Sequence, residues 1–323
     1  MVYILDLLDK KILYELDINS RQSFSELAKK VGKSRNVVEY RVNKLQKDGV
    51  IKNFVTLLDA GRLGLTIWNV YLELQDITPT KEKEIIAYLK SNKKVWWVAL
   101  TTGKWNLIYS IFVKDVKEFH ATVVDFNSKF GKYVLNQSLA AHVEVEIFSR
   151  GYFMNKPSVG HVWYDVIEKV LIDSADKKIL KELSTNARAS SVDLAEKLGL
   201  TPRVVSYRIK ELIRKKVISV FRLQPDVSKI GMGFYKVIVN LKNISKEQDE
   251  SLKEYCRSLG NVFHYEKKIG PWLLELEMDV ESFEKVNQLM KTMKEKYSDY
   301  IKSYEIMLIY AEPKGELDLT QQL

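Results

Sequence analysis

The sequence predicts an α+β protein in which a two-domain unit, one domain helical and the other built on an antiparallel sheet, occurs twice. Three observations predict this: an internal repeat, a change of hydrophobic periodicity within each copy, and a basic excess confined to the helical parts. Sliding the 323-residue chain by 167 positions aligns residues 6–74 with residues 173–241 without a gap, at about 27 identities. This period is too long for a solenoid repeat, so a whole two-domain protein has been duplicated.

The basic residues are distributed unevenly along the chain. Residues 1–62 contain 12 Lys or Arg against 8 Asp or Glu, residues 171–229 contain 13 against 7, and the remainder contains 26 against 27. The net charge of +9 therefore comes from two segments of about 60 residues. Such a partition is typical of surfaces that bind a polyanion. Together with the helices inside these segments, it predicts double-stranded DNA as a partner.

The composition is that of a globular protein, with 46% hydrophobic and 29% charged residues. The single cysteine, Cys256, excludes an internal disulfide framework, a cysteine-based zinc site and a redox pair, and it is typical of a reducing compartment. The sequence shows no signal-like N-terminal region and no apolar run near the roughly 20 residues of a membrane span. We therefore expect a cytoplasmic protein without a membrane partner.

Apolar residues spaced three and four positions apart predict the helical domain. In the first copy this spacing gives helices at residues 7–16, 26–31 and 34–49, followed by a strand at residues 50–57. Ser25 and Ser34 are the expected N-caps, and a short turn with Gly32 joins the last two helices. This order is a helix-turn-helix, of the winged type because a strand follows it. The second copy repeats it at residues 175–183, 192–198, 201–215 and 217–223, and Phe54 and Phe221 are expected to pack beneath the helices.

The third helix of each copy has the pattern of a DNA-recognition helix. One stripe is apolar, through Val38, Val42 and Leu45 in the first copy. The N-caps and the opposite face carry groups that read base edges and bind phosphates. These candidate DNA-binding residues are Ser34, Arg35, Asn36, Tyr40, Arg41, Asn43 and Lys44 in the first copy, and Thr201, Arg203, Ser206, Tyr207, Arg208 and Lys210 in the second.

The roles of these residues follow from their chemistry and position. An N-terminal outward residue of such a helix reaches base edges, so Asn36 is expected to pair with adenine and Arg35 or Arg203 with guanine. The tyrosines and arginines shared by both copies, Tyr40 with Tyr207 and Arg41 with Arg208, either hold phosphates or brace the unit internally. Bracing would take the form of a salt bridge for the arginines and packing against the first helix for the tyrosines.

The two recognition helices differ at the positions that face a DNA groove. The differing pairs are Arg35 and Pro202, Asn36 and Arg203, Glu39 and Ser206, and Asn43 and Lys210. Identical helices read a palindrome. The sequence therefore predicts that this chain reads an asymmetric site.

The second domain of each copy has the order β-α-β-β-α-β, which is ferredoxin-like. In the first copy the expected elements lie at residues 67–74, 80–89, 95–101, 107–113, 116–130 and 134–148. In the second copy they lie at residues 234–241, 247–259, 262–269, 272–278, 283–296 and 303–310. One face of such a sheet must be covered by another sheet or by helices, and two copies are available here.

Nearly the whole chain, twice over, resembles the leucine-responsive regulatory protein / AsnC (Lrp/AsnC) family of transcription regulators. The resemblance is carried by Leu8-Asp9-Lys10-Lys11-Ile12-Leu13, Asn19-Ser20-Arg21, Glu26-Leu27-Ala28, Val31-Gly32-Lys33-Ser34, Val38, Arg41-Val42, Leu45 and Gly49-Val50-Ile51. It implies a regulator that dimerises through paired ferredoxin-like sheets, binds DNA and often senses amino acids. The tandem form implies self-association as a covalent pseudo-dimer, and whether the copies pair within one chain or between chains stays open.

The expected domains follow from the repeat and the resemblance. They are helix-turn-helix domains at residues 1–62 and 171–229, ferredoxin-like domains at residues 63–150 and 230–313, a linker at residues 151–170 and a tail at residues 314–323. The linker contains Tyr152, Phe153, Trp163 and Tyr164. A flexible tether would be polar, so these aromatic residues are expected to pack on a neighbouring domain.

The resemblance places a small-molecule effector, if one exists, at a turn of each ferredoxin-like domain. These turns contain Gly103 and Trp105 in the first copy and Gly270 and Trp272 in the second. Neither turn has the acidic residue that family members often carry there, so amino-acid sensing by the usual chemistry is not expected. The alternative for both tryptophans is a place in the core or in the dimer interface.

Two other functions are alternatives to a sequence-specific regulator. One is a DNA-packaging protein of low sequence specificity. The other is a tetrapyrrole (sirohaem) decarboxylase-like enzyme, since such enzymes share the two-domain layout. The four histidines, His120, His142, His161 and His264, are scattered along the sequence without metal-ligand spacing. We therefore expect no catalytic residues, no metal and no cofactor.

Overall fold

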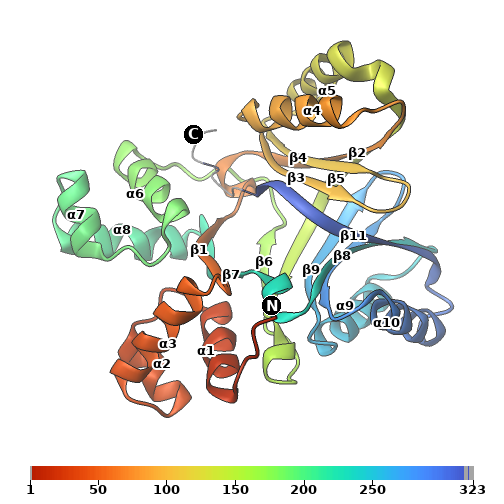
Figure 1. The fold of residues 1–323 in the computed structure, drawn as a ribbon. Coiled ribbons are helices and arrows are strands. Elements are labelled where there is room, and N and C mark those ends of the chain that lie inside the picture. The colour runs from red at the N-terminus through yellow and green to blue at the C-terminus, as the bar shows by residue number, and fades with distance from the viewer. Residues whose placement is uncertain (1, 316–318, 320–323) are drawn as a thin grey trace.

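The computed structural model describes residues 2–315 and residue 319 (Figure 1). The two helix-turn-helix units lie together on one side of the molecule, and the strands of the ferredoxin-like domains lie on the other, with their helices outside. The α+β class with antiparallel sheets is as predicted. Both copies of the unit pair within the single chain.

The first helix-turn-helix unit consists of α1 (Leu7–Ile18), α2 (Phe24–Val31) and α3 (Arg35–Lys47), followed by β1 (Ile51–Leu58). The second consists of α6 (Ser174–Thr185), α7 (Ser191–Leu198) and α8 (Pro202–Arg214), followed by β7 (Ile218–Pro225). The N-cap of α2 is Ser23, and the prediction of Ser25 was wrong. Ser23 and Glu26 form a reciprocal capping box, which the sequence Ser23-Phe24-Ser25-Glu26 allows only from the earlier serine.

A two-stranded antiparallel ribbon of β1 and β7 joins the two units, with Thr56 opposite Phe221. Each helix-turn-helix unit also hydrogen-bonds to the ribbon strand of the other copy. The backbone N–H of Ser20 donates to the carbonyl oxygen of Phe221 (2.9 Å), and that of Ala187 donates to the carbonyl oxygen of Phe54 (3.1 Å). Phe54 and Phe221 are both buried. Each phenylalanine therefore packs at the junction of both copies rather than under its own helices alone.

Eight long strands of the ferredoxin-like domains form one closed antiparallel barrel. The strands of the first copy are β2 (Thr66–Leu74), β3 (Val95–Thr101), β4 (Leu107–Val113) and β5 (Val134–Phe148). Those of the second copy are β8 (Gly233–Leu241), β9 (Val262–Ile269), β10 (Leu274–Val280) and β11 (Ile301–Gly315). The order β2-β4-β3-β11-β8-β10-β9-β5 closes because β5 also pairs with β2.

Closure depends on the two longest strands. The first half of β5 pairs with β2 and its second half with β9, where Ile147 lies opposite His264. In the same way, the first half of β11 pairs with β8 and its end with β3. Both ends extend beyond the ferredoxin-like pattern, and each thus crosses from its own sheet into the other copy. The barrel is therefore the intrachain pseudo-dimer.

Four helices cover the outside of the barrel (Figure 1). They are α4 (Pro79–Ser91) and α5 (Val116–Phe130) on the first sheet, and α9 (Lys246–Ser258) and α10 (Phe283–Lys296) on the second. None of the described helices is long and apolar enough to span a membrane.

The segment predicted as a linker is structured. It contains a short 3₁₀ turn (Gly151–Phe153) and a strand, β6 (Gly160–Tyr164), which pairs with the end of β5. Trp163 is buried and its Nε1–H donates to the carbonyl oxygen of Leu58 (2.8 Å). Tyr152 donates to Asp279 of the second copy (3.2 Å). These two linker aromatic residues therefore pack on neighbouring domains, as expected. Most of the predicted tail, residues 316–318 and 320–323, lies outside the described residues.

Candidate nucleic-acid interface and interior cavity

Both recognition helices begin at a side-chain cap. The hydroxyls of Ser34 and Thr201 accept the backbone N–H groups of Val37 (3.4 Å) and Val204 (3.3 Å). A cap of this kind satisfies an otherwise unpaired N–H and fixes where the helix starts. Ser34 and Thr201 thus set the register of the outward face.

The outward faces of α3 and α8 are largely exposed. Tyr40 is 66% exposed and Tyr207 is 65% exposed, so most of each side chain faces solvent. The other exposed candidate residues are Arg35, Asn36, Asn43 and Lys44 on α3, and Arg203 and Lys210 on α8, with Ser206 half-buried. Lys44 Nζ lies 5.5 Å from the ring of Tyr3. These faces supply the donors that a DNA groove and backbone require.

Arg41 and Arg208 brace their units internally. Arg41 donates to Asp6 (2.8 Å) and Asp9 (3.1 Å), which lie before and within α1. Arg208 donates to Asp173 and Asp176, both at 2.8 Å. Each arginine thus ties the recognition helix to the first helix of its unit, which is the bracing alternative considered above.

The arginines at the starts of the two helices differ in their partners. Arg35 forms an ion pair with Glu39 one turn later, at 3.7 Å. Among the described residues, Arg203 has no ion pair, since Ser206 stands where the first copy has Glu39. The charge of Arg203 is therefore more available to a ligand than that of Arg35.

Two arginines link the helix-turn-helix units to each other. Arg21 donates to the carbonyl oxygen of Ala187 (2.6 Å), and Arg188 donates to the carbonyl oxygens of Ser20 and Gln22. Together with the β1–β7 ribbon, these contacts give α3 and α8 a fixed relative position.

The candidate effector tryptophans lie inside the barrel. Trp105 and Trp272 are 4% and 7% exposed, and their ring centroids are 6.1 Å apart. Gly270 packs closely on the first copy, because a Cβ there would lie 2.7 Å from the carbonyl oxygen of Leu139. Gly103 lies in the corresponding turn, with a positive φ of 92°. The tryptophans thus occupy the core between the two copies, the alternative considered above.

Sequence reasoning missed a buried network of charges in the second half of the barrel. Lys236, which is 1% exposed, donates to Glu275 and Glu277 (2.8 Å each) and to Glu266 (3.3 Å). Lys268 pairs with Glu266 at 2.8 Å. Alternating charged residues in a strand ordinarily face solvent. Here the first copy covers that face of the second, so the charges are buried.

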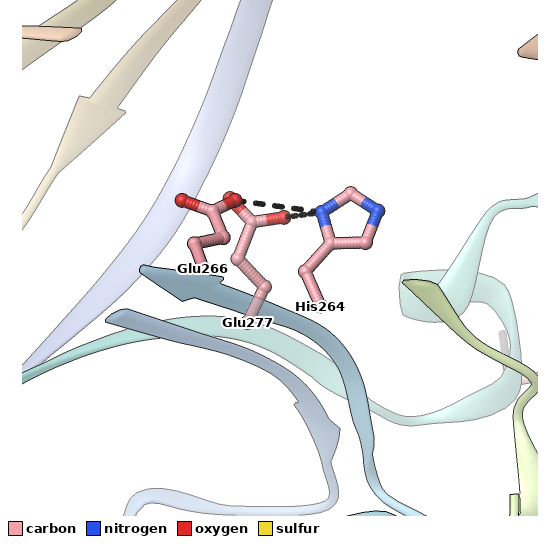
Figure 2. A group of neighbouring side chains, drawn as sticks. All are labelled: His264, Glu266 and Glu277. Atoms are coloured by element: carbon pink, nitrogen blue, oxygen red, sulfur yellow. Dashed lines mark ion pairs between the residues drawn. The ribbon is translucent and has the colours of Figure 1, made fainter. Parts of the chain in front are cut away.

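His264 belongs to the same network. Its Nδ1 lies 2.7 Å from Glu277 and 3.6 Å from Glu266, and the three side chains converge from β9 and β10 (Figure 2). Their ligand atoms are close enough together to hold a metal ion. Both carboxylates, however, already bind Lys236, and a cation there would lie beside that ammonium group. The arrangement is that of a neutralised ion-pair cluster.

The two histidines of the barrel have opposite protonation behaviour. Burial lowers the pKa of His264, but Glu277 and Glu266 outweigh this and raise it above the ordinary value. Burial and the nearby Lys268, whose Nζ lies 2.6 Å from Nε2 of His142, hold the pKa of His142 well below the ordinary value. His142 and His264, distant in sequence, are thus brought to one site.

A cavity of about 180 Å³ adjoins this network. It lies between the β1–β7 ribbon, which supplies residues such as Val55 and Arg222, and the barrel, which supplies Trp96, His142 and His264. The predicted effector residues Trp105 and Trp272 do not line it.

Comparison with known proteins identifies the family. A family model described as winged helix-turn-helix DNA-binding matches residues 5–52 and again residues 172–219. An HTH-type transcriptional regulator of Pyrococcus furiosus is 30% identical over 148 residues, which are 46% of this chain and 97% of that protein. The chain belongs to the family of winged helix-turn-helix transcriptional regulators. This DNA-binding regulator carries the unit twice, and the prediction of a duplicated Lrp/AsnC-type regulator is confirmed.

Two solved structures are similar to this chain. The siroheme decarboxylase NirDL is 14% identical, with a TM-score of 0.64 over 96% of this chain and 92% of that one. At this identity the match shows a shared fold alone. LrpC of B. subtilis is 26% identical, with a TM-score of 0.38 over 44% of this chain and 96% of that one.

Proposed function

We propose that the recognition helices of this regulator read two different half-sites of one DNA duplex. The observation that carries the proposal is the difference between two exposed faces held in one frame. The β1–β7 ribbon and the crossed contacts of Arg21 and Arg188 hold α3 and α8 together. Within that frame, Asn36 and Arg203 occupy the same exposed position of the two helices.

Different side chains at this position select different bases. Asn36 presents an amide, which suits adenine, and Arg203 presents a guanidinium, which suits guanine. Each bidentate contact contributes about 1–3 kcal/mol of discrimination. In this proposal Tyr40 and Tyr207 contact phosphates, which position both helices without reading sequence.

Selection of bound duplexes from a random DNA pool tests the proposal. We expect an enriched sequence whose two halves differ, with a guanine preference in the half contacted by α8. A perfectly symmetric consensus would overturn the proposal. Enrichment of no sequence would instead favour the DNA-packaging function.

A variant that makes the two faces alike sharpens this test. The triple substitution N36R/E39S/N43K gives α3 the residues that α8 carries at three outward positions. We expect the selected consensus to become more symmetric. Lys129→Ala, on the exposed face of α5, is the matched control, and its consensus should equal that of the unmodified chain.

We further propose that this regulator has no catalytic role. The curated relatives, which are HTH-type transcriptional regulators, support this proposal. Titration with siroheme, followed by absorbance, is the test. We expect an unchanged spectrum, and a saturable spectral shift would count against the proposal.

A further inference from the structure

The cavity between the ribbon and the barrel has two donors without acceptors. Among the described residues, the Nε–H of Arg222 and the Nε1–H of Trp96 are buried and make no hydrogen bond. Both residues line the cavity. Buried donors are nearly always paired, so these two are available to an occupant that brings acceptor atoms.

Aromatic side chains form part of the cavity walls. They include Trp96, Trp97, Trp163, Phe234 and Phe263. The volume, about 180 Å³, exceeds that of an engineered apolar cavity of about 150 Å³ that binds benzene. The cavity therefore has room for one aromatic ring with a small substituent.

The charged groups around the cavity already neutralise one another. Arg222 binds both carboxylate oxygens of Asp17 (2.8 Å each), and Arg150 binds Asp17 and Asp279. Lys236 and His264 are paired with glutamates, as described above. Glu312 accepts the Nε1–H of Trp97 (2.9 Å), and burial raises its pKa. Lys52, the remaining lysine of the lining, pairs with Asp226 at 4.0 Å. An anionic occupant would thus lack a free counter-charge, which is costly in a buried site.

We propose that this cavity binds a small, uncharged, planar aromatic molecule that carries a carbonyl or ring-nitrogen acceptor. Trp96 and Arg222 donate to the acceptor, and the aromatic walls cover the ring. Strands β1 and β7 form one wall and directly follow the recognition helices α3 and α8. The occupant therefore acts as an effector of DNA binding, a consequence that rests on the proposed function.

Three compounds of similar shape test the ligand class: benzamide, benzoate and toluene. The tryptophans that line the cavity report binding through their fluorescence. We expect saturable binding of benzamide, with benzoate and toluene at least about tenfold weaker, because one adds a charge and the other removes the acceptor. No saturable change with benzamide, or equal affinity for toluene, would overturn the proposal.

Trp96→Phe isolates the donor. Phe263 occupies the equivalent position in the second copy, so an aromatic ring of this kind fits the fold. We expect W96F to bind benzamide about tenfold more weakly and toluene unchanged. Trp105→Phe, outside the cavity, is the control and should bind benzamide normally.

A second variant, Arg222→Val, places the first-copy residue Val55 at the matching position. It should also weaken benzamide binding, provided that circular dichroism shows a folded chain. Benzamide affinity unchanged in both W96F and folded R222V would refute the assignment of the donors.

DNA affinity with and without saturating benzamide tests the regulatory consequence, since coupling between two ligands is reciprocal. We expect at least about a threefold change in Kd, and an unchanged Kd would overturn the effector role. Benzamide binding does not require DNA. A symmetric DNA consensus together with tight benzamide binding would therefore refute the half-site proposal and leave the cavity site standing.

Discussion

The two helix-turn-helix units are braced alike, whereas the two halves of the barrel have different interiors. Arg41 and Arg208 bind matching pairs of aspartates at 2.8–3.1 Å. Both α2 and α7 begin with a serine capping box. The scaffold that presents each recognition helix is thus the same in both copies, while the exposed residues on it differ.

Inside the barrel the copies differ in charge at every position of the network. The uncharged first-copy residues and their charged counterparts are Asn69 and Lys236, Trp97 and His264, Ala99 and Glu266, Thr101 and Lys268, Ile108 and Glu275, Ser110 and Glu277, and Phe112 and Asp279. A homodimer cannot have one charged and one neutral half. Duplication within a chain allows it, and the resulting polar half adjoins the cavity.

Breaking the charge network should have the largest effect on stability. Lys236→Asn introduces the first-copy residue and leaves three buried glutamates facing Lys268 and His264. Because one negative charge then lacks a partner, we expect the free energy of unfolding to fall by about 3–5 kcal/mol. Urea denaturation followed by circular dichroism measures it.

The double variant K236N/E277S is the matched control. It also restores the first-copy serine and balances the charges again. We expect it to recover about half of the loss. If K236N alone is as stable as the unmodified chain, Lys236 does not stabilise the network. The charged interior of the second half would then not depend on this ion pairing.

The contacts that cross between the helix-turn-helix units should have the next largest effect. Arg188 donates to two carbonyl oxygens and Arg21 to one. We therefore expect Arg188→Ala to lower the free energy of unfolding by about 1.5–3 kcal/mol, and Arg21→Ala by less. Thermal unfolding of both variants checks the order, and a reversed order would show that contacts other than these hydrogen bonds dominate.

The features that the sequence predicted best are local. The caps at Ser34 and Thr201 and the apolar stripe through Val38 and Leu45 depend on neighbours within a few residues. The order of strands and helices could be predicted for the same reason. The end of β11 could not be predicted, because its last residues form a strand only by pairing with β3 of the other copy.

The interior site was missed because its residues meet only after the barrel closes. Lys236 lies 30 residues from Glu266, and His142 lies 126 residues from Lys268. One signal was present in the sequence. Each ferredoxin-like sheet buries one face under its own helices, so the other face, which holds Lys236 in the second copy, had to meet the first copy.

DNA binding should show a smaller difference between the copies. Lys210→Asn gives α8 the residue that α3 carries as Asn43. If Lys210 contacts a phosphate, the slope of log affinity against log salt should fall by about 1. Asn43→Ala is the control and should keep the slope. Equal slopes for all three proteins would remove Lys210 from the interface.

The pH dependence of stability should distinguish the contribution of His264 from that of His142. Because the pKa of His264 is raised in the folded state, its contribution is complete below the unfolded value of 6.5 and is lost as the pH rises through the folded-state pKa. The pKa of His142 is lowered, so its contribution is lost as the pH falls below 6.5.

Stability should therefore decline on both sides of neutrality, and urea unfolding between about pH 5 and pH 9 measures it. His264→Gln should flatten the alkaline side, because the remaining histidine of the pair titrates only toward acid. His142→Ile, which introduces the residue found at Ile309 in the second copy, should flatten the acid side. If both variants showed the same dependence of unfolding free energy on pH, the pKa values of the two histidines would not be shifted in opposite directions.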